Sequence, residues 1–577
     1  MKKGVLFLLS ALTFGTLVTT SITSCASSQN DDSVATISIF SKSDVVTYEI
    51  ENSKETYSAG DKISLKLTFQ DGYDLAYVTL NGEKVEDITS ITLKSGDNVI
   101  NIYAKGTNGN EGSTNIRDFV FEATNNGREY SVISYIPSGI LPSIVEIPET
   151  FNGKPVTSLD YRVNKDGSVI SRYNFGGVKG IFIPKTIKNI DGNVFRTNVS
   201  VASFKVDEAN ENFSSDGTNL FNKDKTKLIS YAQGSKGEVV IPTTVKTIGE
   251  YAFFGANELS KVTLNEGLTK IEKYAFASCK QISEIVIPNS VTQIDEYAFQ
   301  NCLDLKKVIL SESLTRIPSY CFSQCSKIAE ITIPASVKTI STYAFFSTGG
   351  LKKITFREGL ATIGETAFSY TGVEELNFPK SLRSIGKSAF AGCDYLTKVH
   401  FEEGIESLGD TVFNVTKQLN EINIPASLTK IGKACFTACL SLKEFVVNEN
   451  NVNYKSIDGV LFDKEGKTLI SYPNSKDAKE YVIPSTTEKL DYHSFNYISN
   501  HPLGESSTYY SLENLTIPKS VKIMENPFYG AKLREVIYEG TEEEFLLINS
   551  TIIVDNNPVS WNDGSSIAKI TYKGSKA

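Results

Sequence analysis

The hydrophobic and polar positions of this chain repeat with a period of 23 residues through its central part. A phenylalanine marks each repeat, in steps of 23 residues with a single step of 22, at Phe253, Phe276, Phe299, Phe322, Phe345, Phe368, Phe390, Phe413 and Phe436. A fixed period of this length predicts a solenoid, in which each turn contacts only its neighbours.

Each repeat contains one short strand pattern. Counted from Phe299 as position 0, apolar residues occupy −8, −5, 0, +6, +9 and +11, and the last three are Leu305, Val308 and Leu310. This LxxVxL pattern predicts a strand with +9 and +11 inward and +8 and +10 outward. Burying six side chains cannot offset the entropy of ordering 23 residues, so we expect stacked turns that share a parallel β-sheet and carry caps at the ends.

Position +8 alternates in charge along the stack. Its members are Lys261, Glu284, Lys307, Glu330, Lys353, Glu375, Lys398, Glu421 and Glu444. Side chains at one position of neighbouring strands stand about 4.8 Å apart, so opposite charges attract each other there. The alternation indicates turns stacked in register, with an electrostatic docking strip as the alternative interpretation.

Position +10, the next outward position, is β-branched or neutral in most repeats. It would form the middle of the inner sheet surface, and repeat proteins commonly bind partners along such a concave face. The same residue types are also those that a strand prefers, so the row is equally consistent with a structural role. Its candidate binding residues are Thr263, Val286, Ile309, Thr332, Thr355, Asn377, His400 and Asn423.

Position −2 carries a tyrosine in five consecutive repeats, followed by Thr366 and Ser388. We expect these tyrosines to lie partly exposed on the side of the coil opposite the sheet, where they could bind a protein or glycan. A ladder that stacks on itself and merely covers the turn is the alternative. The five candidates are Tyr251, Tyr274, Tyr297, Tyr320 and Tyr343.

Seven cysteines lie within the repeats, five at +3 and two at −1. Other repeats place alanine or threonine at +3, which indicates a small buried position. The cysteines form no CxxC pair, so we predict no zinc site. We predict buried free thiols, although adjacent turns would place the Cα atoms of Cys279, Cys302 and Cys325 near the separation that a disulfide permits.

The first residues are typical of a secretory signal peptide, 1–24, with Lys2 and Lys3 before a short apolar run. The segment from Ile22 to Cys25 resembles a bacterial lipobox, which implies lipidation of Cys25 and cleavage before it. Residues 25–36 then contain the lipidated cysteine and a polar, flexible tether.

Residues 37–126 change to a period of two, with an Asn81-Gly82 hairpin signal. About 90 residues of short strands fit one small β-sandwich similar to bacterial immunoglobulin-like modules. We expect a spacer, with independent binding as the alternative.

Residues 127–540 form the predicted solenoid, interrupted by two similar inserts near 205–240 and 446–482. Each insert carries an LF…LISY sequence that alternates around a polar turn, which predicts a β-hairpin grafted onto one edge of the stack. Residues 541–577 form the predicted C-terminal cap, where Thr541 and Glu544 have the spacing of a capping box.

The repeated sequence IPxSVxxIGxxAFxxCxxLxxIxIP, the twin inserts and the YEGTEEEF segment resemble the BspA-like class of bacterial leucine-rich repeat proteins. The resemblance covers residues 130–577. It implies a leucine-rich-repeat solenoid and a surface-exposed adhesion or interaction protein, without catalytic residues to transfer.

The remaining chemistry of the chain is sparse. The net charge of −9 argues against a nucleic-acid or anionic-membrane surface. The three histidines, His400, His493 and His501, sit in no nucleophile or metal motif. We therefore predict no catalytic residues, no metal, no cofactor and no enzyme activity, with a cell-surface hydrolase as the least favoured alternative.

The sequence predicts a monomeric binding protein, lipid-anchored at the bacterial surface, in the outer membrane if the organism has one. Its partners would be a host extracellular-matrix or cell-surface protein, a glycan or another bacterium, with membrane contact only through the lipid. A structural or coat protein that merely extends and shields is the alternative.

Overall fold

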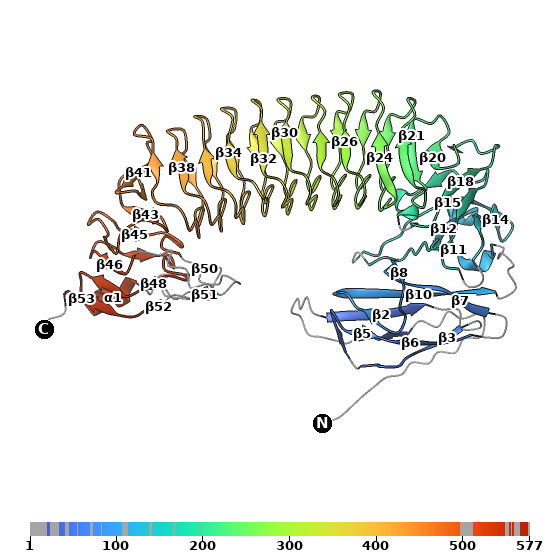
Figure 1. Cartoon of the computed structure of the whole chain (residues 1–577), viewed down its shortest axis with the longest axis horizontal. Coiled ribbons are helices and arrows are strands. Elements are labelled where there is room, and N and C mark those ends of the chain that lie inside the picture. Colours follow the sequence, from blue (N-terminus) through green and yellow to red (C-terminus); the bar gives the residue numbers. More distant parts are fainter. Residues whose placement is uncertain are drawn as a thin grey trace. The chain divides into compact units, whose positions relative to one another are not determined.

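The computed structural model describes residues 20–22, 34–40, 46–54, 56–69, 73–81, 83–106, 114–137, 141–165, 168–196, 198–496, 512–548, 553–554, 557–558 and 566–574. The chain divides into two compact units between Ser235 and Lys236, and each is built almost entirely of strands (Figure 1). Cys25 and all of the signal peptide except Thr20–Ile22 (β1) lie outside the described residues.

The first unit begins with a small β-sandwich. Its inward positions alternate along the strands, so that Ile37, Leu65, Val78 and Ile100 are fully buried in one cluster. One sheet contains β2 (Val34–Phe40), β10 (Gly96–Gly106), β7 (Tyr73–Leu80) and β8 (Glu83–Val85), and β3 (Val46–Ile50) pairs with β6 (Leu65–Phe69). Asn81 takes the left-handed conformation in the turn between β7 and β8.

The repeats of the first unit start with a hairpin. The strand β11 (Phe119–Thr124) falls within the residues assigned to the sandwich from the sequence, but it pairs antiparallel with β12 (Glu129–Tyr135). In turn β12 pairs in parallel with β15 (Lys154–Leu159), which pairs with β17 (Asn189–Ile190). The hairpin therefore closes the open end of the first turns, as a solenoid requires.

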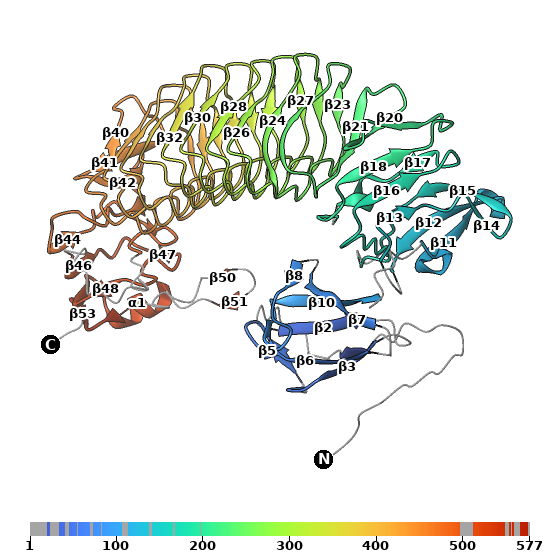
Figure 2. The same ribbon diagram turned by 45° about the vertical axis from the view of Figure 1, so that its right-hand side comes forward.

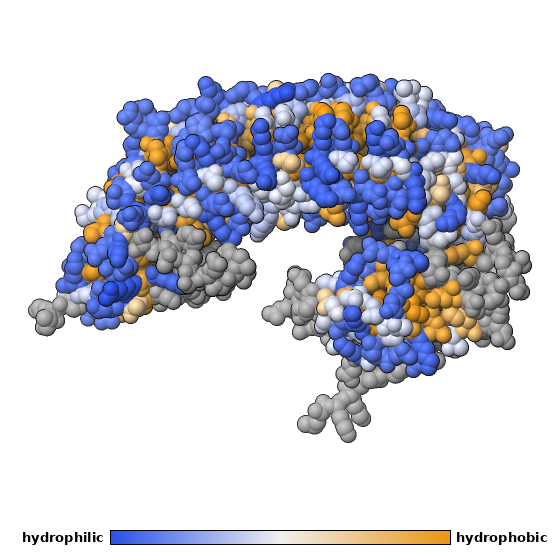
Figure 3. Space-filling view, in the orientation of Figure 1, coloured by the Kyte–Doolittle hydropathy of each residue, from blue (hydrophilic) through white to orange (hydrophobic). Residues whose placement is uncertain are grey.

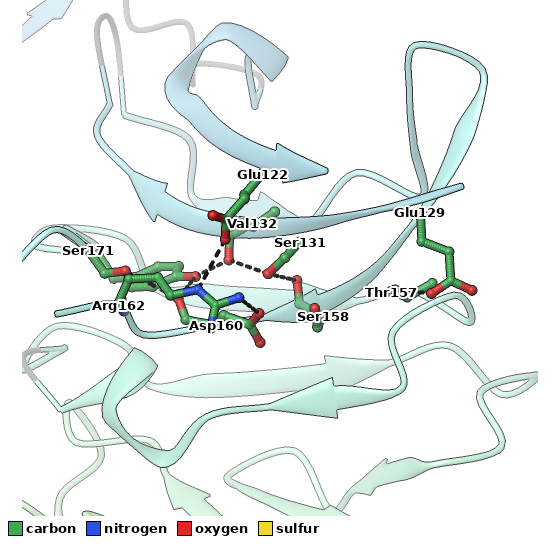
Figure 4. A network of polar contacts seen from close by, with 10 residues as sticks. Glu122, Glu129, Ser131, Val132, Thr157, Ser158, Asp160, Arg162 and Ser171 are labelled. Atoms are coloured by element: carbon green, nitrogen blue, oxygen red, sulfur yellow. Dashed lines mark hydrogen bonds and ion pairs between the residues drawn. The ribbon is translucent and has the colours of Figure 1, made fainter. Parts of the chain in front are cut away.

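A polar network fixes the segment that follows β15 (Figure 4). The Arg162 guanidinium donates to Glu122 on β11 at 3.1 Å and to Asp160 at 3.0 Å. The backbone N–H of Arg162 donates to the Ser171 hydroxyl at 2.7 Å. These bonds connect the hairpin of β11 and β12 to the loop that follows β15. They stabilise the end of the stack, which has no preceding turn among the described residues to pair with.

The second unit is a stack of solenoid turns, each contributing one strand to each of two parallel sheets (Figures 1 and 2). Sheet A contains β22 (Gly237–Val240), β24 (Leu259–Thr263), β26 (Glu284–Val286), β28 (Lys307–Ile309), β30 (Glu330–Ile333), β32 (Lys353–Phe356), β34 (Glu375–Asn377), β36 (Lys398–His400), β38 (Glu421–Ile424) and β40 (Val446–Val447). Its strands are the ones predicted from LxxVxL, and the 23-residue parallel solenoid is confirmed.

Sheet B was not predicted from the sequence. It contains β23 (Thr247–Ile248), β25 (Lys270–Ile271), β27 (Gln293–Ile294), β29 (Arg316–Ile317), β31 (Thr339–Ile340), β33 (Thr362–Ile363), β35 (Ser384–Ile385), β37 (Ser407–Leu408) and β39 (Lys430–Ile431). Ladder pairing runs from β23 to β27 and again from β29 to β39. Each strand has only two residues, too few for an alternating pattern, and forms because stacking brings position −5 of successive turns together.

The core between the sheets is a column of the repeated phenylalanines. The rings of Phe276 and Phe299 stack with centroids 5.2 Å apart, and the other members repeat this geometry along the stack. All nine marker phenylalanines are buried. Each ring is covered by the ring above and below, which explains why a single turn cannot fold alone.

Sheet A shows a period of two turns. Ladder pairing joins β22 to β24, β26 to β28 and β30 to β32, and continues unbroken only from β34 to β40. The first strand of each pair precedes an Ile-Pro or Phe-Pro step, as at Ile287-Pro288. Proline has no backbone N–H to donate, so alternate strand ends differ in hydrogen bonding.

Each insert is a three-stranded meander. The second contains β41 (Tyr454–Ile457), β42 (Val460–Asp463) and β43 (Thr468–Ser471), and the first contains β19 (Phe213–Ser215), β20 (Asn219–Asn222) and β21 (Lys227–Tyr231). The strand β43 pairs in parallel with β45 (Lys489–Leu490). The sequence predicted a hairpin attached to one edge of the stack. The second insert instead contributes a strand to the parallel pairing of the stack.

The C-terminal end carries a cap. The strands β44 (Glu480–Val482), β46 (Asn514–Ile517), β49 (Glu535–Tyr538) and β53 (Ile570–Tyr572) form a parallel sheet beside the helix α1 (Glu542–Ile548). The predicted capping box is confirmed, because Thr541 N–H donates to Glu544 at 2.9 Å and Glu544 N–H donates to the Thr541 hydroxyl at 3.2 Å. No helix in the described part of the chain is long and apolar enough to span a membrane.

Candidate binding surface

The outward face of sheet A carries the two rows expected from the sequence, at positions +8 and +10. The +10 row is exposed in every strand from Thr263 to His400, and half-buried at Asn423. Its apolar members stand out, with Val286 at 46% and Ile309 at 45% exposure. The preceding strand β22 extends both rows, with Glu238 at +8 and Val240, which is 72% exposed, at +10. In the space-filling view, apolar surface lies over the strands around β26 among hydrophilic side chains (Figure 3).

The +8 row is a ladder of opposite charges. Glu284 lies opposite Lys307 in the strand register, and their charged atoms are 2.6 Å apart. Lys398 lies 2.6 Å from Glu421, and this hydrogen bond raises the pKa of Lys398 above its ordinary value. Lys261 pairs with Glu238 at 3.3 Å. In-register stacking of this row, predicted from the alternation, is confirmed.

A groove crosses the start of this face. It has a volume of about 580 Å³ and lies over β22, β24 and β26. Thr263 and Val286 from the +10 row line it, together with Glu238, Lys261 and Glu284 from the +8 row. The groove therefore offers both apolar contact and paired charges along sheet A.

The tyrosines at −2 form a continuous stack. Successive rings from Tyr251 to Tyr343 have centroids 4.6 to 4.8 Å apart and are inclined by less than 20°. Their backbones are left-handed, with φ between 55° and 61°. Bulky residues rarely adopt this conformation. Ring-free residues at −2, such as Thr366 and Ala434, share it, so the turn imposes this backbone and ring stacking offsets its cost at the tyrosines.

The stacking covers the ring faces of the ladder. All five side chains are half-buried, and Phe254 and Phe346 pack edge-on against the two end rings. Burial and the neighbouring tyrosines raise the pKa of Tyr297 and Tyr320 above the usual 10.0. The ladder thus presents ring edges and hydroxyls to solvent, rather than the flat aromatic area that sugar stacking requires.

Position −2 changes chemistry further along the stack. Ser388 and Thr411 hydroxyls lie 2.7 Å apart in a hydrogen bond, which continues the ladder with polar groups. Beside this row, position −3 alternates in charge at Glu365, Lys387, Asp410 and Lys433. This second alternation was not predicted from the sequence, although the repeat spacing places these four residues at one position of successive turns.

The repeat cysteines are structural. All seven in the described chain are free and buried, which confirms the prediction of buried thiols. Cys302 donates to the backbone carbonyl of Phe276 in the preceding turn at 3.1 Å, and Cys279 and Cys325 make equivalent bonds. Burial raises the pKa of the Cys393 thiol to about 11 and of the Cys439 thiol to about 12.

The histidines lie apart from one another. His400 is exposed on sheet A, and His501 is outside the described residues. His493 stacks between Tyr492 and Tyr529, and burial lowers its pKa to about 4. Among the described residues, no group of three or more histidine, cysteine, aspartate or glutamate side chains could hold a metal ion.

The chain is similar to known repeat proteins. Residues 230–352 and 338–467 match the model described as a BspA type leucine rich repeat region, with 6 copies. No curated protein is significantly similar to the chain in sequence.

Several solved structures resemble it. One is a leucine-rich repeat protein from Bacteroides ovatus, at 21% identity and a TM-score of 0.42, covering 80% of this chain and 100% of that one. The pneumococcal vaccine antigen PcpA has 22% identity and a TM-score of 0.36, covering 54% and 82%. A leucine rich cell surface protein from Faecalibacterium prausnitzii has 20% identity and a TM-score of 0.34, covering 59% and 95%.

Proposed function

The second unit carries a BspA-type leucine-rich repeat region, and we propose on this basis that the chain is a bacterial surface protein that binds partner proteins through sheet A. Repeat solenoids commonly use an extended sheet face for binding, because every turn adds one side chain to each row.

The exposed apolar side chains of the +10 row are the observation that carries this proposal. Val240, Val286 and Ile309 are exposed on sheet A, and Val286 lines the groove. The charged side chains of the +8 row beside them form ion pairs. Protein interfaces combine such an apolar centre with a polar rim.

A protein partner fits this face better than a charged polymer or a glycan. The alternating +8 row has no excess of one sign to attract a polyanion. The tyrosine ladder, which could have offered sugar-stacking surface, has its ring faces covered by neighbouring rings. Binding by ring edges and hydroxyls of the ladder is the second candidate.

Anchoring through Cys25 is part of the proposal. The lipobox-like Ile22–Cys25 and the polar residues 26–36 that follow support a lipid anchor with a flexible tether. Mass spectrometry of the membrane fraction would find a diacylglyceryl group on Cys25, and a Cys25→Ser variant would be recovered in the soluble fraction.

The binding role is tested with the full chain on immobilised host matrix proteins, whole bacteria and a glycan panel. We expect saturable binding to a protein that falls at least tenfold in a Val286→Ser/Ile309→Ser variant. Val452→Ser removes an even more exposed valine outside sheet A and serves as the control.

Three other results would point elsewhere. A loss of binding confined to Tyr274→Ser/Tyr297→Ser/Tyr320→Ser would move the site to the ladder. Absence of saturable binding to every surface would favour a structural coat protein. Turnover in a substrate screen would favour a hydrolase.

A further inference from the structure

The +8 row of sheet A is complementary to itself when its order is reversed. From β22 to β32 the row contains Glu238, Lys261, Glu284, Lys307, Glu330 and Lys353, with strictly alternating signs, and the alternation continues through Glu375, Lys398 and Glu421. Reading the same row backwards exchanges every negative charge for a positive one. We propose that this face of sheet A binds the same face of a second copy of the chain, across a two-fold axis between β26 and β28.

The charges select the direction of that axis. Two sheets packed face to face can be related by an axis along the strands or by one along the stack. An axis along the stack keeps the turn order and reverses the strands. If it runs along the +8 row it places each lysine over the same lysine of the second copy, and if it runs beside that row it places the charges over the uncharged +10 row. An axis along the strands reverses the turn order, keeps the +8 row over the +8 row, and places Glu284 over Lys307 of the second copy.

The +10 row selects which strands of the longer alternating row meet. It is β-branched throughout β22 to β32, and becomes Asn377, His400 and Asn423 in β34, β36 and β38. The proposed axis places Val286 over Ile309 of the second copy, twice by symmetry, at the centre of the contact. The outer pairs are Thr263 with Thr332 and Val240 with Thr355.

The groove lies on the same surface. It covers β22 to β26, and the two-fold axis places β28 to β32 of the second copy over it. Ile309, which is 45% exposed, would then enter a groove lined by Val286 and Thr263. Because each copy contributes both the groove and the side chain that enters it, the interface is closed and limited to two chains.

The contact is small, which sets the expected strength. Six strands about 4.8 Å apart and a face roughly 15 Å wide give about 400 Å² per copy, half of a standard interface. We expect a weak dimer in solution. Chains tethered to one surface or to facing surfaces would meet at a much higher effective concentration. This assembly departs from the monomer predicted from the sequence, and it rests on the proposed use of sheet A as a binding face.

The test is sedimentation equilibrium of the full chain and two charge-reversed variants. Glu284→Lys places lysine over lysine across the axis, and Lys307→Glu places glutamate over glutamate. Both residues are solvent-exposed, so each change should leave the fold intact, and both variants lose the same exposed Glu284–Lys307 ion pair. We expect the wild-type chain to approach twice its monomer mass with rising concentration, and each variant to associate at least tenfold more weakly.

An equimolar mixture of the two variants tests whether opposite charges across the axis restore association. The Glu284→Lys chain carries lysine at both central positions, and the Lys307→Glu chain carries glutamate at both. Opposite charges therefore face each other at every central contact of the mixed dimer, which should recover association close to wild type. A variant that had merely misfolded would not be rescued in this way. Val286→Ser/Ile309→Ser should dimerise at least tenfold more weakly, without rescue by either charge variant.

A wild-type chain that stays monomeric at the highest concentration measured would overturn the proposal. Equal dimerisation of all variants would overturn it too. In either case, foreign-protein binding that is lost in Val286→Ser/Ile309→Ser would leave the proposed function standing. Dimerisation without any foreign binding would instead restrict sheet A to self-association.

Discussion

The rings of Tyr274 and Tyr297 stack with centroids 4.6 Å apart, although each residue holds a left-handed backbone that tyrosine ordinarily avoids. Two effects oppose each other at this position. The left-handed backbone favours asparagine or glycine, whereas ring stacking favours an aromatic side chain. The free energy of unfolding of variants at this position measures which effect is larger.

We expect Tyr297→Asn to destabilise the chain by about 1 to 2 kcal/mol, because the loss of two ring contacts outweighs the relief of the left-handed backbone. Tyr297→Phe keeps the stack and should cost less than about 0.5 kcal/mol. Urea unfolding followed by circular dichroism measures both. Ala434→Asn changes a left-handed −2 position that has no ring, and isolates the backbone effect. A Tyr297→Asn variant more stable than wild type would contradict the stack's role.

The ladder also predicts how stability depends on pH. Burial and neighbouring rings raise the pKa of Tyr297 and Tyr320 above 10.0, so the folded state holds these protons more tightly than the unfolded state. Their contribution is fully present below about pH 10 and is lost as the pH rises through the folded pKa values. Unfolding free energies measured between about pH 8 and pH 12 would show the decline. A Tyr297→Phe/Tyr320→Phe variant should show a smaller one.

The buried thiols predict low reactivity. Because every repeat cysteine is buried and several thiols donate to backbone carbonyls, we expect no reaction with a thiol reagent in the native state. All seven should react after unfolding. Peptide mapping without reductant that found a bridge between Cys279 and Cys302 would contradict this.

Position +3 should accept threonine better than a larger side chain. Thr348 occupies it in another turn and makes the same bond to a phenylalanine carbonyl, at 3.0 Å. Cys302→Thr should therefore cost less than about 1.5 kcal/mol, whereas Cys302→Leu overfills the site and should cost about 1 to 3 kcal/mol or more. Urea unfolding distinguishes the two variants, and equal stabilities would show that the position is not tightly packed.

Close approach between turns predicts a sharp difference between two glycines. A Cβ on Gly432 would lie 2.3 Å from the backbone carbon of Gly409 in the preceding turn, whereas a Cβ on Gly349 would meet nothing within 4 Å. Gly432→Ala should force neighbouring turns apart and cost more than about 2 kcal/mol. Gly349→Ala should be nearly neutral and serves as the control. Similar stabilities of the two variants in urea would argue against tight packing at this position.

The repeat length, the sheet A strands and the charge ladder could be predicted because each depends only on spacing along the chain. A 23-residue period places equivalent residues of successive turns side by side, so Glu284 opposite Lys307 follows from counting. The capping box at Thr541 is similarly local, since its two hydrogen bonds join residues three apart.

Three features could not be predicted without the tertiary structure. They are sheet B, the mutual covering of the tyrosine ring faces, and the groove over β22 to β26. Two residues such as Gln293 and Ile294 show no strand pattern, and they form one only because neighbouring turns supply the hydrogen bonds. The sequence determined by itself that Tyr274 and Tyr297 would be neighbours. Only the stacking of the turns decided that their ring faces would contact each other and leave sheet A with the exposed apolar row.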